Sequence, residues 1–144
     1  MILNTAKAKV MVGGSPALNL GTDAFQAVLT TSAQALTASF TGTSGAARYS
    51  DLTAELPTAD GYTAGGVALS SVTFTETAGE LTWNSANITW TLTGSVTFKY
   101  MVLYDNTAGT KDLVSYCDFD TSGGSITPTS GPLVMVINGI LTIE

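Results

Sequence analysis

The sequence predicts an all-β fold, either an antiparallel β-sandwich or a jelly-roll-like barrel, with at most one short helix. Threonine, serine, valine and glycine dominate the composition while lysine, glutamate and arginine are scarce, which favours strands and turns over helices. Several segments alternate apolar and polar residues with a period of two. Polar turn segments separate them at intervals of about 8–12 residues, a spacing typical of sandwiches and barrels.

The expected strands follow from these alternating segments. Residues 88–92 place Ile88, Trp90 and Leu92 on one face and threonines on the other, which predicts a strand with one buried face. Residues 95–104 begin in the same way and then become apolar on both faces, so we expect half of this strand to be buried on both sides. The other expected strands lie at residues 9–12, 25–29, 36–40, 72–75, 81–83, 113–119 and 133–143, with a turn at 76–80.

Two of these segments carry a further expectation about topology. Residues 113–119 follow turn-forming residues after 95–104 and should return as its hairpin partner. Residues 133–143 read as two short strands, or as one strand bent at Asn138 and Gly139. No linker and no internal repeat divides the chain, so we expect one domain over residues 1–144.

One segment has a helical pattern, residues 49–56, which Pro57 ends. Ser50 is a candidate cap, and Leu52 and Leu56 would share a face four residues apart. This is the only helix we expect. The predicted core includes four residues on inward strand faces: Trp90, Phe98, Val102 and Phe119.

Composition excludes several classes of function. The formal net charge of −6 argues against nucleic-acid binding through a basic patch, and no apolar run approaches the roughly 18 residues of a membrane span. The chain has no histidine, which removes Ser-His-Asp and Cys-His nucleophile systems and every zinc site that contains histidine. We therefore expect no enzyme and no cofactor. No export signal is expected either, so the sequon at Asn87 carries little weight.

The segment from Asp118 to Gly123 begins like a calcium loop, with oxygen ligands at alternate positions and a glycine at the sixth. The twelfth position, where an EF-hand has its bidentate glutamate, is Thr129, and no helices flank the segment. We interpret Asp118 and Asp120 as solvated acids at a strand end. No metal-dependent folding is expected.

Other candidate sites have simpler explanations. Glu76 and Glu80 could form a carboxylate pair for glycoside hydrolysis, but they flank a turn, where acids are ordinarily exposed. Cys117 has no partner base and is expected to be a small buried apolar residue. Residues 62–67 lack the lysine of a phosphate loop and indicate a turn that lets the backbone approach a neighbour. A sugar-stacking platform could use the larger aromatic residues, although core packing is their ordinary role: Trp83, Trp90, Tyr100, Tyr104 and Tyr116.

Several segments occur together in an order that resembles a known family. They are Tyr-Ser-Asp-Leu at 49–52 with Glu55 and Leu56, Gly-Tyr-Thr-Ala-Gly-Gly-Val-Ala-Leu at 61–69, Ile-Thr-Trp at 88–90, Val-Leu-Tyr-Asp-Asn-Thr at 102–107, and Ser-Tyr-Cys-Asp-Phe at 115–119. The chain resembles, over roughly residues 48–144, a family of small structural proteins encoded among the virion genes of tailed bacteriophages. The glycine-rich element at 61–67 is its most specific part. Asp120 departs from the family, which usually has glycine after the Asp-Phe pair.

The resemblance implies a virion component without catalytic residues, placed on the capsid surface and made in the host cytoplasm. The expected function is that of a decoration (cement) protein that binds the major capsid protein and stabilises the head. A trimer is expected at the local threefold positions of the shell. A tail or fibre component is the structural alternative, and a carbohydrate-binding module is the alternative from another class. Residues 1–20 lie outside the resemblance and are a candidate extended arm or edge strand that contacts a neighbour.

Overall fold

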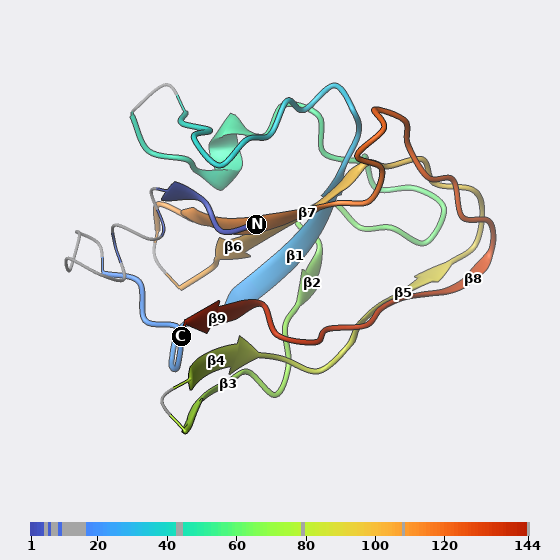
Figure 1. Ribbon diagram of the computed structural model, residues 1–144. Coiled ribbons are helices and arrows are strands. Elements are labelled where there is room, and N and C mark those ends of the chain that lie inside the picture. Colours follow the sequence, from blue (N-terminus) through green and yellow to red (C-terminus); the bar gives the residue numbers. More distant parts are fainter. Residues whose placement is uncertain are drawn as a thin grey trace.

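A computed structural model of the chain describes residues 1–4, 6, 9, 17–42, 45–78, 80–107 and 109–143 (Figure 1). Its regular structure is nearly all β, which confirms the predicted fold class. The sheets of the described chain are open and antiparallel, so the sandwich, not the closed barrel, is the alternative that the chain adopts. The elements are β1 (Phe25–Thr30), η1 (Tyr49–Asp51), β2 (Val67–Ala68), β3 (Thr73–Thr77), β4 (Glu80–Asn84), β5 (Ile88–Leu92), β6 (Tyr100–Asp105), β7 (Leu113–Asp118), β8 (Gly131–Met135) and β9 (Leu141–Ile143).

The central layer is a four-stranded sheet with the order β2-β1-β6-β7. All residues of β6 are buried, because β1 and β7 flank it and both faces of the sheet are covered. This confirms that the second half of the segment 95–104 is buried on both sides. β7 is the hairpin partner of β6, as predicted, with a register irregularity between Leu103 and Tyr104.

The second layer is one bent antiparallel ribbon. β4 pairs with β9 and β5 pairs with β8, and β4 runs on towards β5 as β8 runs on towards β9 (Figure 1). Trp83 pairs with Leu141 and Ile88 pairs with Met135, so the four residues between these pairs on one side of the ribbon face five on the other. The extra residue is accommodated where the ribbon bends, between its two arms. Residues 133–143 therefore form two short strands.

Two asparagine side chains stabilise this bend. Asn84 Oδ1 accepts hydrogen bonds from the backbone N–H groups of Ser85 at 2.9 Å and of Gly139 at 3.4 Å. Asn87 Oδ1 accepts one from Ile137 N–H at 3.1 Å. Because the strand ladder is interrupted here, these side chains satisfy backbone donors that would otherwise lack a protein partner.

Aromatic side chains fill the space between the layers. The rings of Phe25 in β1 and Trp83 in β4 meet edge to face, with centroids 4.9 Å apart. Of the predicted core residues, Trp90, Phe98 and Val102 are buried, as expected. Phe119 is only partly buried and packs its ring edge to face against Phe98, with centroids 5.5 Å apart.

The predicted helix at residues 49–56 is wrong beyond its first turn. The structure has a single 3-10 turn, η1, whose N-cap is Arg48 in place of Ser50, and Asp51 Oδ2 accepts the Arg48 backbone N–H at 3.0 Å. The chain after η1 is extended, because Leu56 N–H donates to Leu29 O at 3.0 Å and so pairs it with β1. Tertiary pairing overrides the weak helical preference of so short a segment.

Of the expected strands, one is absent and one is wrong in part. Residues 36–40 form no strand, since Phe40 N–H donates to Thr37 O at 2.9 Å and turns the segment back on itself. Residues 95–99 are not a continuous strand, and Phe98 instead forms an isolated bridge with Ile126. The expected strand at 9–12 lies outside the described residues except for Lys9, which has helical backbone geometry together with Asn4 and Ala6.

The described residues near the N-terminus pack on the chain's own sheet. Ile2 forms an antiparallel bridge with Ser115 of β7, and Leu3 N–H donates to Val114 O at 3.0 Å. Leu3 and Ala6 are buried in the core, as are Leu18 and Leu20. These four side chains belong to the proposed arm at residues 1–20, and they contribute to the stability of the domain itself.

Candidate interaction surface

A groove of about 480 Å³ opens between the two layers, beside the bend in the ribbon. One wall is the β6–β7 hairpin with Met1 next to it, and the other wall is residues 134–140. Met101 and Cys117 are directly paired across β6 and β7. Ile140 N–H donates to Trp83 O at 2.7 Å, which anchors the second wall to the ribbon.

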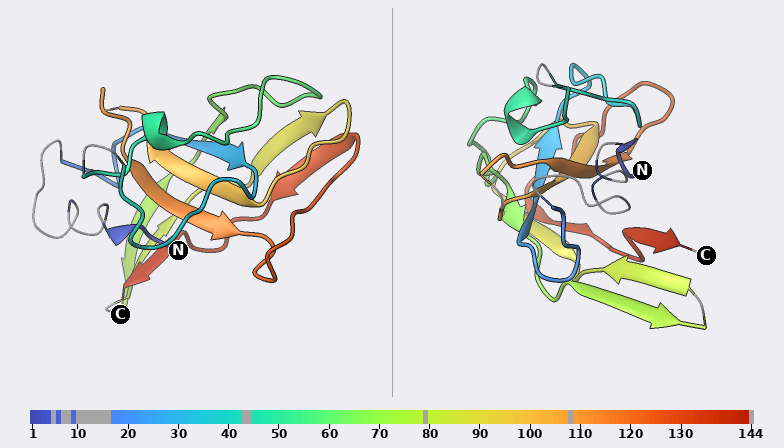
Figure 2. Two further views of the ribbon diagram at one scale, coloured as in Figure 1. Left: turned by 90° about the horizontal axis from the view of Figure 1, so that it is seen from above. Right: turned by 90° about the vertical axis from the view of Figure 1, so that its left-hand side faces the viewer.

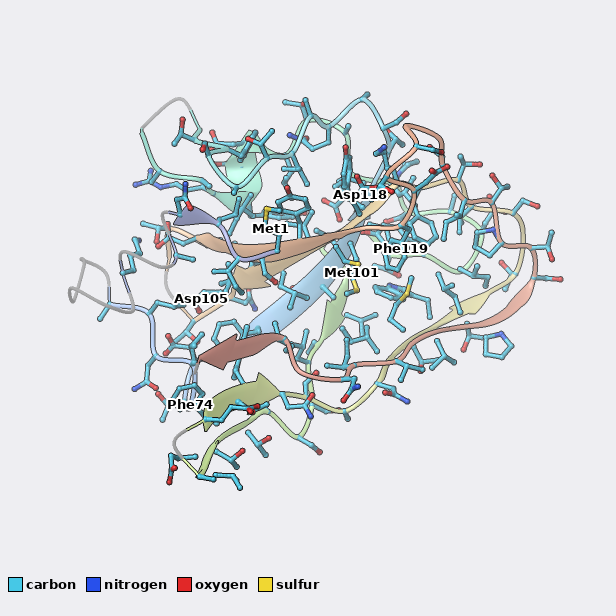
Figure 3. All side chains as sticks on the ribbon, in the orientation of Figure 1. Met1, Phe74, Met101, Asp105, Asp118 and Phe119 are labelled. Carbon is cyan, nitrogen blue, oxygen red and sulfur yellow. The ribbon has the colours of Figure 1, made fainter. Side chains whose placement is uncertain are left out.

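Within the described part of the chain, no charged side chain lines this groove, although the chain carries 16 charged residues. The N-terminal ammonium of Met1 lies beside it and donates to Tyr116 O. Among the described residues, four large hydrophobic side chains are exposed, and three of them line the groove: Met1 at 67%, Val134 at 45% and Val136 at 75%. The fourth is Phe74 of β3 (labelled in Figure 3). A concentration of exposed apolar side chains without charge is typical of a protein–protein contact.

Cys117 contradicts the expectation of a small buried residue, because its side chain is exposed at the groove. β7 is buried from Leu113 to Tyr116 and then emerges into solvent. Desolvation of the sulfur raises the pKa of the thiol; the N-terminal ammonium of Met1 opposes this shift and the nearby Asp118 carboxylate adds to it.

The acidic loop after β7 already holds a cation from its own chain. Lys99 Nζ donates to Asp120 O at 2.8 Å and lies 3.7 Å from Asp118 Oδ1. Hydrogen bonds from the Ser122 hydroxyl and backbone N–H lower the pKa of Asp120. Within the described residues, no group of three histidine, cysteine, aspartate or glutamate side chains is positioned to hold a metal ion.

We therefore predict that calcium does not stabilise the fold, because the Lys99 ammonium already contacts the Asp118 carboxylate and the Asp120 backbone carbonyl. Thermal melts with chelator and with excess calcium should coincide. The matched control is Lys99→Met, which removes the internal cation while keeping an apolar stem. A calcium-dependent rise in Tm of the unmodified protein, lost in Asp118→Ala, would contradict this prediction.

The other sequence candidates are dispersed. Glu76 and Glu80 lie on either side of the β3–β4 turn, where Glu80 pairs with Thr77 and accepts a hydrogen bond from Thr82 at 3.3 Å. Neither of them lines the groove. The five aromatic residues considered as a sugar platform are all buried: Trp83, Trp90, Tyr100, Tyr104 and Tyr116. Rings in the core offer no flat face to a glycan.

A second cluster joins three tyrosines to Glu55. The hydroxyl groups of Tyr49 and Tyr62 donate to the two oxygens of the Glu55 carboxylate, at 2.5 and 2.8 Å, and Gly65 N–H donates to Oε1 at 2.7 Å. The ring of Tyr104 stacks on Tyr49 with centroids 4.6 Å apart, and its hydroxyl donates to Gly65 O at 3.0 Å. Sequence reasoning missed this cluster, although its residues belong to the segments that carry the family resemblance.

The cluster fastens the glycine-rich element to the central sheet. Gly66 has a φ of +78°, and a Cβ at this position would lie 1.9 Å from Ala27 O. Only glycine allows the backbone to approach β1 so closely. The interpretation of residues 62–67 as a turn that lets the backbone approach a neighbour is therefore confirmed.

We predict that this cluster makes the fold sensitive to alkali. Burial, reinforced by the Glu55 carboxylate, raises the pKa of Tyr49 and Tyr62 well above the usual value of about 10. Since the folded pKa is the higher one, the associated stability is complete below about pH 10 and is lost as the pH rises above it. Urea unfolding as a function of pH, read with tyrosinate absorbance, measures this. Glu55→Gln should lower the pH at which tyrosinate absorbance of the folded protein begins to rise, because the carboxylate that helps to raise both pKa values is gone. Ordinary titration of every tyrosine in the folded protein would contradict the prediction.

The geometry thus defines an all-β domain with a groove that exposes apolar side chains and a partly buried polar cluster. Comparisons with family models, with curated proteins and with solved structures find no match to this chain. Among the described residues, the structure contains no helix of the length and apolar character that a membrane crossing requires.

Proposed function

We propose that the chain is a virion structural protein, a decoration (cement) protein that binds the outer surface of a bacteriophage head and joins neighbouring major capsid subunits. The observation that carries the proposal is the groove without charged side chains, which exposes Met1, Val134 and Val136 on an otherwise acidic protein. Apolar side chains exposed together cost free energy unless a partner covers them. The family resemblance of residues 48–144 indicates the major capsid protein as that partner.

A structural role fits the rest of the molecule. The groove binds by shape and apolar contact, and the proposed function requires neither catalysis nor a cofactor. Cement proteins stabilise a shell by linkage, because they bind the assembled lattice and not its separated subunits. Each contact can be weak if several act together, and a trimer at a local threefold position would supply that avidity.

The test is to add the purified protein to phage heads that lack it. Saturable binding over the whole head, together with a higher temperature of DNA release, is expected. Measuring the mass of the bound and free protein tests the proposed trimer separately. Binding at the tail alone, or full occupancy without stabilisation, would replace this proposal with the tail or fibre alternative.

A further inference from the structure

β3 is an edge strand with solvent on both faces. It is the last strand in the order β3-β4-β9, so β4 is its only paired strand in the described chain. All five residues of β3 are exposed, including Phe74 at 41%. The β3–β4 hairpin projects from the body of the molecule (Figure 2, right). A strand in this position presents its outer backbone groups to any other chain.

The other outer edges in the described chain are short, covered or interrupted. β9 has only three residues. Residues 60–61 lie against the end of β5, where Thr93 N–H donates to Asp60 O at 2.9 Å and a Cβ on Gly61 would lie 2.2 Å from Thr91 O. β2 has only two residues, and the outer edge of β7 is bridged by Ile2. β8 contains Pro132, which has no backbone N–H to donate. β3 has none of these protections. Its sequence Thr-Phe-Thr-Glu-Thr contains no lysine, proline or glycine, and it pairs with β4 in unbroken register.

The hairpin turn determines which backbone groups face outward. Thr77 pairs with Glu80 across a connection of two residues, and the pairs Thr75–Thr82 and Thr73–Asn84 follow along the ladder. Because antiparallel pairs alternate in hydrogen bonding, the odd-numbered residues direct their N–H and C=O groups to β4. Phe74 and Glu76 therefore direct their N–H and C=O groups to the outer edge.

We propose that β3 pairs antiparallel with β3 of a second copy of this chain, about a two-fold axis at Thr75. This register places Thr75 opposite Thr75 of the second copy and Phe74 opposite Glu76, with position 74 at a hydrogen-bonding site. Threonine pairs are favourable across strands, and no carboxylate lies directly opposite another. A register centred on Glu76 would oppose two carboxylates in a protein that already carries a net charge of −6. Pairing would join two three-stranded sheets into one.

This contact does not depend on the proposed capsid function, since it requires only the free edge and a second copy. Five residues per strand form a small interface, below the range of stable complexes. We therefore expect association that is weak in dilute solution and strengthened wherever copies are held close together.

Disulfide trapping tests the register. In a Cys117→Ser background, Thr75→Cys leaves one cysteine per chain, and oxidised glutathione serves as the oxidant that takes the two electrons. Opposed strand residues place their Cα atoms about 4.5–5.5 Å apart, within the range for a disulfide. A covalent dimer of doubled mass is expected. Thr89→Cys in the same background, on the exposed face of β5, is the matched control and should stay monomeric. Equal trapping of both variants, or of neither, would overturn the proposal.

Charge pairing gives a second, independent test. Thr75→Lys and Thr75→Glu each oppose like charges at the axis and should weaken self-association by roughly five-fold, measured by sedimentation equilibrium. An equal mixture of the two variants should recover it, because lysine then faces glutamate. Far-ultraviolet circular dichroism checks that each variant is folded. Unchanged association of the single variants, or no recovery in the mixture, would contradict the two-fold contact.

Discussion

Replacing Phe98 with alanine is expected to lower the free energy of unfolding by about 3–5 kcal/mol, the usual range for a buried aromatic residue. Phe98 is fully buried, and its ring packs edge to face on Phe119. Its backbone N–H donates to Ile126 O at 3.0 Å and so fixes the loop before β8. The truncation removes the transfer free energy of the ring and leaves a cavity that this paired backbone cannot readily close. Urea denaturation measures the loss.

Phe74→Ala is the matched control, because it makes the same chemical change on the exposed edge strand β3. Its cost should stay within about 0.5 kcal/mol, as for most surface substitutions. If Phe98→Ala and Phe74→Ala lower the free energy of unfolding equally, Phe98 does not hold the loop against the core. A small cost for Phe98→Ala alone would place its ring outside the core.

The strands that could be predicted from the sequence are those whose pattern is local. Ile88, Trp90 and Leu92 alternate with threonines, and β5 has the predicted bounds because one face meets the core and the other meets solvent. The apolar run in β6 likewise reports burial on both sides. In both cases the residue pattern depends on the environment of each side chain, which a single sequence records.

The errors occur where a partner distant in the sequence decides the structure. Residues 50–56 have helical spacing, but Leu56 pairs with Leu29 and draws the segment into an extended form. Residues 36–40 alternate like a strand, yet no neighbouring strand pairs with them. Local preference describes these segments correctly but does not determine their structure, because it contains no information about which strands are available to pair with them.

The groove could not be predicted for a related reason. Its walls come from residues 101–119 and 134–140, and its methionine, valine and isoleucine side chains are the same types that fill the core. Cys117 illustrates the difficulty, since an apolar neighbourhood in the sequence suggested burial whereas the fold leaves it at the surface. Only the bend in the ribbon, which separates residues 136–140 from β7, determines that these side chains remain uncovered.

The groove also decides how the proposed capsid binding should be tested. Deleting residues 1–20 was an obvious experiment on the sequence alone, because that segment is a candidate arm. The structure shows Leu3, Ala6, Leu18 and Leu20 in the core, so the deletion would remove buried apolar side chains and destabilise the domain. A substitution of an exposed groove residue separates binding from folding.

Val136→Lys and Val136→Glu are therefore expected to weaken binding to phage heads by about thirty-fold or more, the loss typical of a central contact residue. Val136 is 75% exposed in the free protein, so neither change should lower its unfolding free energy by more than about 0.5 kcal/mol. Both signs of charge should act alike, because the cost comes from burying a charge against an apolar partner surface. Titration of heads with each variant measures the affinity.

Thr63→Lys is the control for added charge, since Thr63 is exposed in the glycine-rich element and does not line the groove. It should bind heads as the unmodified protein does. If lysine at position 136 weakens binding while glutamate strengthens it, the contact is electrostatic and the groove is not its apolar centre. If neither variant changes binding, another face of the molecule contacts the capsid, and the groove then needs a different partner.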